Sequence, residues 1–86
     1  MKRPSIIKRI GDMEVFSKAP LLELTGEDHL LIENHQGVLV YSFEEIQIKV
    51  AYGKVSVKGK NLMIRQMSKE QLAISGGIDD IHLSRR

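Results

Sequence analysis

From residue 21 onward, the hydrophobic positions of the chain recur every second residue. The clearest run alternates Ile46, Ile48 and Val50 with polar neighbours. Shorter runs with the same period cover residues 21–25, 29–33, 38–42, 54–58, 62–65, 72–74 and 78–83. A period of two predicts strands that bury one face and expose the other to water.

Turn-forming residues separate these runs about every 7–10 residues, which is typical of small all-β proteins. The separators include residues 26–28, 52–53, 59–61 and 76–77. We therefore predict an all-β fold, a small antiparallel β roll or sandwich of about seven or eight short strands. The even spacing also permits a β-solenoid of stacked short strands, although such rungs usually resemble one another more closely.

Residues 30–40 place two apolar runs on either side of the polar segment 33–37. We expect a β-hairpin here, with Gly37 taking the positive φ that a tight turn often requires. Asn34 and His35 either bind their own backbone or face a partner, and the sequence leaves both interpretations open.

The first residues follow a different, helical period. Ile6, Ile10 and Met13 recur at i, i+4 and i+7, which predicts a short amphipathic helix over residues 4–15. Pro20 pushes the residue before it into an extended conformation and ends the helical part. We expect a helical leader at 1–19 and an all-β domain at 20–86. The basic residues Lys8 and Arg9 could contact an anionic membrane or an acidic partner, or the helix could simply cover one end of the sheet.

Length and composition exclude several classes of protein. A chain of 86 residues without cysteine has no disulfide framework and no thiolate metal site. No apolar run approaches the roughly 20 residues that a membrane-spanning helix needs. The basic N-terminus lacks the apolar region of a secretory signal. We expect a cytoplasmic protein without a transmembrane segment, able at most to contact a membrane peripherally.

Charge is distributed in blocks. All charged side chains between residues 21 and 46 are acidic, and all those between 47 and 69 are basic. These blocks attract one another if they pair across strands. Alternatively, they form a dipolar surface that binds partners or joins copies of the chain head to tail.

No constellation of residues indicates catalysis. His29, His35 and His82 lack metal-ligand spacing. The adjacent acids at 44–45 and 79–80 point to opposite faces of a strand and form no local pair for acid–base chemistry. Residues 76–77 lack the lysine and helix of a phosphate-binding loop. We expect a protein that is not an enzyme, with no catalytic residue, no metal site and no cofactor.

The basic residues between 49 and 69 raise the question of nucleic acid. Proteins that bind single strands interleave aromatic platforms with basic grooves. Here only Tyr52 lies at the edge of the basic run. This argues against nucleic acid, yet binding of nucleic acid or anionic surfaces through Lys54, Lys58 and Lys60 stays open as the alternative function.

Several stretches resemble the YabP/YqfC family of sporulation proteins. The most specific is Ile32-Glu33-Asn34-His35-Gln36-Gly37, and the leader before the domain resembles the YqfC branch. The chain departs from the family pattern at residues 76–77, where one glycine before a charged residue is expected. The resemblance continues through residues 20–26, 38–40, 45–48, 53–59, 62–64, 72–76 and 78–81.

This resemblance implies a non-enzymatic factor made in the mother cell of an endospore-forming bacterium. It also implies a protein partner, a membrane protein of the sporulation programme, at the forespore envelope. Open strand edges would suit addition to another protein's sheet or to copies of this chain. We predict a contact surface that comprises Glu33, Asn34, His35 and Gly37, together with Lys8 and Arg9 of the leader.

Overall fold

A computed structural model describes residues 19–85, which form β-strands joined by turns and short connections. The predicted all-β class is confirmed. The helix expected over residues 4–15 lies outside the described residues, and the division at residue 19 stays a prediction. The strands are β1 (Leu21–Thr25), β2 (His29–Glu33), β3 (Val38–Tyr41), β4 (Glu45–Val50), β5 (Gly53–Met67) and β6 (Gln71–Arg85).

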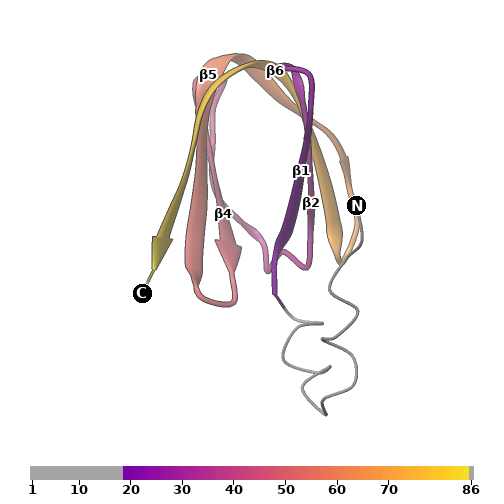
Figure 1. The fold of residues 1–86 in the computed structure, drawn as a ribbon, viewed down its shortest axis with the longest axis vertical. Helices are drawn as coiled ribbons and strands as arrows, with labels where there is room; N and C mark the ends of the chain where they lie inside the picture. Colours follow the sequence, from indigo (N-terminus) through magenta and orange to yellow (C-terminus); the bar gives the residue numbers. More distant parts are fainter. Residues whose placement is uncertain (1–18, 86) are drawn as a thin grey trace.

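All six strands belong to one antiparallel sheet in the order β1-β2-β6-β5-β4-β3. The sheet does not lie flat, because β5 and β6 arch over the top of the molecule and two halves of the sheet face each other (Figure 1). The predicted antiparallel roll or sandwich is therefore confirmed. The solenoid alternative is wrong, because its stacked rungs would pair in parallel.

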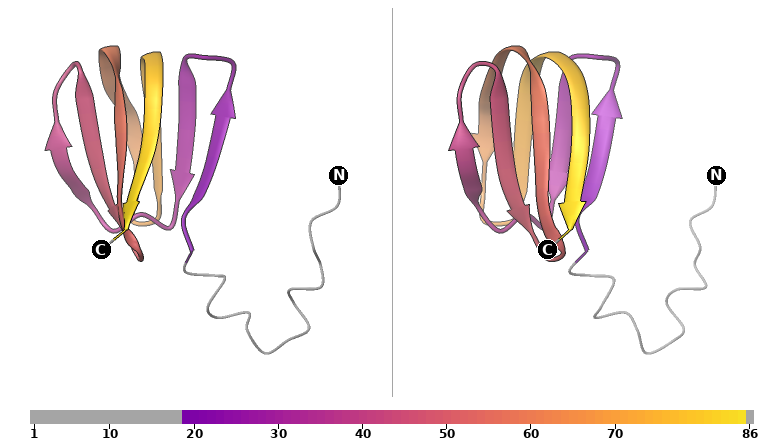
Figure 2. Two further views of the ribbon diagram at one scale, coloured as in Figure 1. Left: turned by 60° about the vertical axis from the view of Figure 1, so that its left-hand side comes forward. Right: turned by 90° about the vertical axis from the view of Figure 1, so that its left-hand side faces the viewer.

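The arch divides the sheet into two layers. Residues 53–58 of β5 pair with β4 and with residues 80–85 of β6, whereas residues 63–67 of β5 pair with residues 72–75 of β6. The β3/β4 layer comprises β3, β4, residues 53–58 of β5 and residues 80–85 of β6. The β1/β2 layer comprises β1, β2, residues 63–67 of β5 and the first residues of β6, up to Ser75. Figure 2 shows the two layers one behind the other.

Local irregularities bend β5 and β6 at the arch. The register shifts between Lys58 and Gly59 and again between Lys60 and Met63. Asn61 and Gly76 have φ angles of 52° and 132°, and such residues bend a strand without ending it. The prediction of a turn at 59–61 is therefore wrong. At 76–77, where the sequence allows a hairpin turn or a bulge, the structure has an irregularity of the bulge kind within one strand. Each pair of expected short strands is one strand of 15 residues, which gives six strands rather than seven or eight.

The space between the layers is filled by one apolar core. The alternation along β4 puts Ile46, Ile48 and Val50 inside, and β2 and the first residues of β6 follow the same period. Each strand buries only one face, so the sheet acquires a core only by folding over on itself. The remaining buried hydrophobic residues are Leu30, Ile32, Val55, Val57, Leu62, Leu72 and Ile74.

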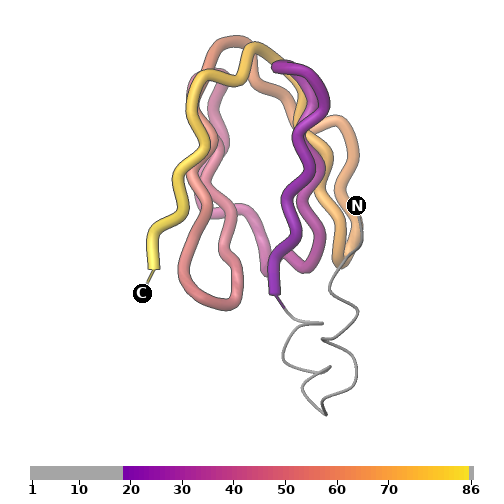
Figure 3. Tube along the Cα trace, viewed as in Figure 1, coloured from indigo at the N-terminus to yellow at the C-terminus, as the bar shows by residue number. Residues whose placement is uncertain are grey.

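The predicted hairpin at residues 30–40 is wrong. β2 pairs with β1 and β6, whereas β3 pairs only with β4 at the other end of the sheet. Residues 34–37 instead cross from the β1/β2 layer to the β3/β4 layer, which Figure 3 shows at the bottom of the trace. The backbone there hydrogen-bonds to β4 and to the β5–β6 turn, so β2 and β3 separate. A hairpin turn does occur at residues 26–28, as predicted, and another occurs at 51–52, one residue before the predicted 52–53.

Candidate functional site

Residues 33–37, which we call the corner, carry the predicted contact surface. The corner begins where β2 ends, and Asn34 takes a φ of 65° to redirect the chain. The backbone N–H of Asn34 donates to the carbonyl oxygen of Glu70 at 2.7 Å. The side-chain Nδ2 of Asn34 donates to the carbonyl oxygen of Ala19 at 2.8 Å. Asn34 thereby connects the end of β2 to the β5–β6 turn and to the residues that precede β1.

His35 lies inside the corner and is only 7% exposed. Its Nδ1 accepts a hydrogen bond from the amide of Gly37 at 3.0 Å, so Nε2 carries the proton of the neutral ring. Nε2 then donates to the carbonyl oxygen of Ser68 at 2.9 Å. Both ring nitrogens are used within the chain, and His35 joins the corner to the β5–β6 turn.

The second half of the corner attaches to β4. The backbone N–H of Gln36 donates to the carbonyl oxygen of Lys49 at 2.7 Å. In turn, the backbone N–H of Lys49 donates to the carbonyl oxygen of Gly37 at 2.8 Å. Gly37 has a φ of 121°, which is accessible to glycine without a steric penalty. These bonds lead the chain out of one layer and into the other.

The predicted surface is thus divided. Asn34, His35 and Gly37 make internal hydrogen bonds, whereas Glu33 lies at the surface and accepts a hydrogen bond from Gln71 at 3.2 Å. The structure places these residues together, as expected from their adjacency. Lys8 and Arg9 lie outside the described residues.

Candidate chemistry is sparse in residues 19–85. Within this part of the chain, no three histidine, aspartate or glutamate side chains gather in a way that could hold a metal ion. Asp28 and His29 form a pair at 2.9 Å, but both side chains are more than half exposed. No helix suited to crossing a membrane occurs in the same part of the chain.

Exposed apolar side chains are a feature that the sequence analysis missed. Every residue of β1 is exposed, although Leu21, Leu22 and Leu24 make it an apolar strand. The signal was available, because adjacent leucines at 21 and 22 put apolar side chains on both faces. Phe43, in the loop before β4, lines a shallow pocket of about 370 Å³ with Tyr41 and Ser42.

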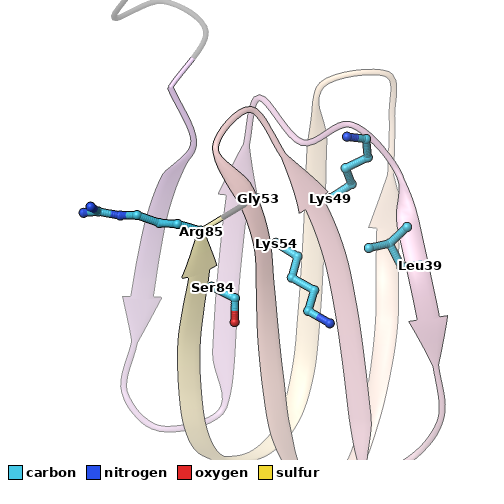
Figure 4. A pocket seen from close by; sticks show the side chains of 6 residues that line it. All are labelled: Leu39, Lys49, Gly53, Lys54, Ser84 and Arg85. Atoms are coloured by element: carbon cyan, nitrogen blue, oxygen red, sulfur yellow. The ribbon is translucent and has the colours of Figure 1, made fainter.

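The charge blocks are only partly neutralised across strands. Lys58 lies between Glu45 of β4 and Asp80 of β6, as expected for blocks that attract one another. Lys49, however, lies directly opposite Lys54. Both line a second shallow pocket of about 410 Å³ with Leu39, Gly53, Ser84 and Arg85, and Figure 4 shows Arg85 extending away from Lys54.

Comparisons with known proteins agree with the resemblance noted from the sequence. The sequence model of the YabP family matches residues 17–86. The uncharacterized protein YqfC of Bacillus subtilis (strain 168) is 32% identical over 66 residues, which cover 77% of this chain and 71% of that protein. No solved structure matches the chain. The corner, the arch and the core all fall within the matched residues, and the chain belongs to the YabP family.

Proposed function

We propose that this chain is a non-enzymatic binding and assembly factor in endospore formation. Membership of the YabP family supports the link to sporulation. The observation that carries a binding role is β1, an edge strand of the sheet whose five residues are all exposed and include three leucines. Open apolar edges of this kind mark sites where another protein chain adds to a sheet.

The proposed place of action is the mother cell, at the cytoplasmic surface of the forespore membrane, with a sporulation membrane protein as partner. The chain would act there as a peripheral protein. The exposed edges would supply main-chain hydrogen bonds to the partner, and their leucines would supply apolar contact.

Capture from sporulating cells tests this proposal. The tagged full chain, crosslinked in its endospore-forming host, is expected to co-purify with a sporulation membrane protein. Deletion of the gene is expected to lower the number of heat-resistant spores by orders of magnitude. The matched control is Ile48→Asp, which buries a charge in the core and prevents folding. Normal spore numbers without the gene would contradict the proposal.

A second candidate function is the binding of nucleic acid or another anionic surface. Lys49 facing Lys54 favours it, because neither lysine has an opposing carboxylate at its cross-strand position. The wild-type chain would then retard DNA or RNA at low salt, and the double variant Lys49→Gln, Lys54→Gln would abolish that retardation. Lys58 was among the lysines expected from the sequence to bind, but in the structure it lies between Glu45 and Asp80. The control is therefore Lys58→Gln, which removes a charge already flanked by carboxylates. Unretarded nucleic acid at low salt would eliminate the nucleic-acid form of this function.

A further inference from the structure

Folding the sheet over leaves the molecule with two open sides. β1 and residues 80–85 of β6 are the outermost strands of their layers on one side, which we call the β1/β6 side. β3 and residues 63–67 of β5 are outermost on the other, which we call the β3/β5 side. The right-hand view in Figure 2 shows these two sides at opposite margins of the layers. Among residues 19–85, no further strand pairs with any of these four edges.

The β1/β6 side exposes side chains that belong to the inner faces of both layers. Leu22 and Leu24 lie opposite the buried Ile32 and Leu30, and they therefore point inward. Leu83 lies opposite the buried Val55 in the other layer. These leucines are 36%, 49% and 45% exposed. They form the uncovered rim of the core rather than part of the solvated outer surface.

The β3/β5 side has the corresponding rim. Tyr41 lies opposite the buried Ile46, and Met67 opposite the buried Leu72. The Tyr41 hydroxyl accepts a hydrogen bond from the amide of Ile64 at 3.0 Å, which connects the two layers at this side. Tyr41, Ser42 and Phe43 line the 370 Å³ pocket here. This side therefore offers an aromatic recess, whereas the other side offers exposed leucines.

The two sides also differ in charge. The strands of the β1/β6 side carry Glu23 and Asp80, with Arg85 at the end of β6. The strands of the β3/β5 side carry Arg65 and no carboxylate. Acidic and basic edges attract each other when two copies meet with unlike sides. Pairing of β1 with β1 of a second copy is disfavoured, because Glu23, the central residue of the strand, would face its own counterpart.

We propose that copies of this chain assemble head to tail, with the β1/β6 side of one copy joined to the β3/β5 side of the next. Each junction would continue both layers as sheets running from copy to copy, and the two rims would merge into a continuous core. An interface between unlike surfaces leaves one free surface of each kind, so assembly proceeds to rings or filaments and does not stop at a dimer. The assembly uses the same β1 edge that the proposed function assigns to a partner, but its test, the oligomeric state of the purified chain, does not depend on a role in sporulation.

Two variants, each with one blocked side, test the proposal with the full chain. Leu24→Glu blocks the β1/β6 side and Phe43→Glu blocks the β3/β5 side, and both substitutions replace exposed side chains. The control is Tyr52→Glu, which adds the same charge at an exposed hairpin turn on neither side. Thermal unfolding of each variant establishes that it folds, and sedimentation measures its oligomeric state over a range of concentrations.

We expect the wild type and the Tyr52→Glu control to form species larger than dimers as concentration rises. Each blocked variant alone is expected to be monomeric. An equimolar mixture of the two is expected to form 1:1 dimers, because each contributes its remaining intact side and the two blocked sides repel. A wild type that is monomeric up to about 1 mM, a wild type that stops at dimers, or a mixture that stays monomeric would overturn the proposal.

Discussion

Replacing Gly76 by alanine is expected to destabilise the arch strongly. Gly76 has a φ of 132°, where a side chain is strained by about 1–3 kcal/mol. Its Cβ would also lie 2.6 Å from the carbonyl oxygen of Asn61 and 2.9 Å from the Cα of Leu62. Since these neighbours are backbone atoms of β5, relief requires β5 and β6 to move apart. We expect the midpoint of thermal unfolding to fall by about 10 °C or more.

The neighbouring glycine provides a matched control for this prediction. A Cβ on Gly77 would lie 3.7 Å from the carbonyl oxygen of Lys60, an ordinary contact, and its φ is not positive. Gly77→Ala is therefore expected to change the free energy of unfolding by less than about 0.5 kcal/mol. Equal losses in the two variants would show that the arch does not depend on the conformation of Gly76.

Replacing His35 by alanine is expected to be the second large effect. The substitution leaves the amide of Gly37 and the carbonyl oxygen of Ser68 without their partners in a part-buried position. Each unpaired group costs about 1–3 kcal/mol when it stays out of water, and the small side chain leaves a cavity. We expect a loss of about 2–4 kcal/mol in the free energy of unfolding, measured by urea denaturation.

Gln36→Ala is the control for His35, because Gln36 is exposed and its contribution to the corner is its backbone amide. We expect its stability to remain within about 0.5 kcal/mol of the wild type. The same two variants distinguish the two interpretations of the corner. If His35→Ala loses both stability and spore formation while Gln36→Ala loses neither, the corner is structural. Loss of spore formation in Gln36→Ala at unchanged stability would instead indicate a contact surface.

The candidate site was only partly predictable. The segment 33–37 was found because its polar residues interrupt two apolar runs, and the structure brings these residues together. The use of its side chains was not predictable, because Asn34 and His35 bind residues 15 and 33 positions away in the chain. The exposure of Leu22 and Leu24 was missed for a similar reason. Alternation indicates which face of a strand points inward, but not whether a second layer covers that face.

The sequence by itself determined the all-β class, the segments that form strands and the inward face of those segments that alternate cleanly. These properties follow from local periodicity, since a residue's side of a strand depends only on its neighbours. Only the tertiary structure decided that residues 59–61 and 76–77 bend strands instead of ending them, and that residues 33–37 cross between layers. A glycine permits a turn, a bulge or a crossing equally well. The choice among them depends on hydrogen bonds to distant strands, which exist only once the sheet has folded over.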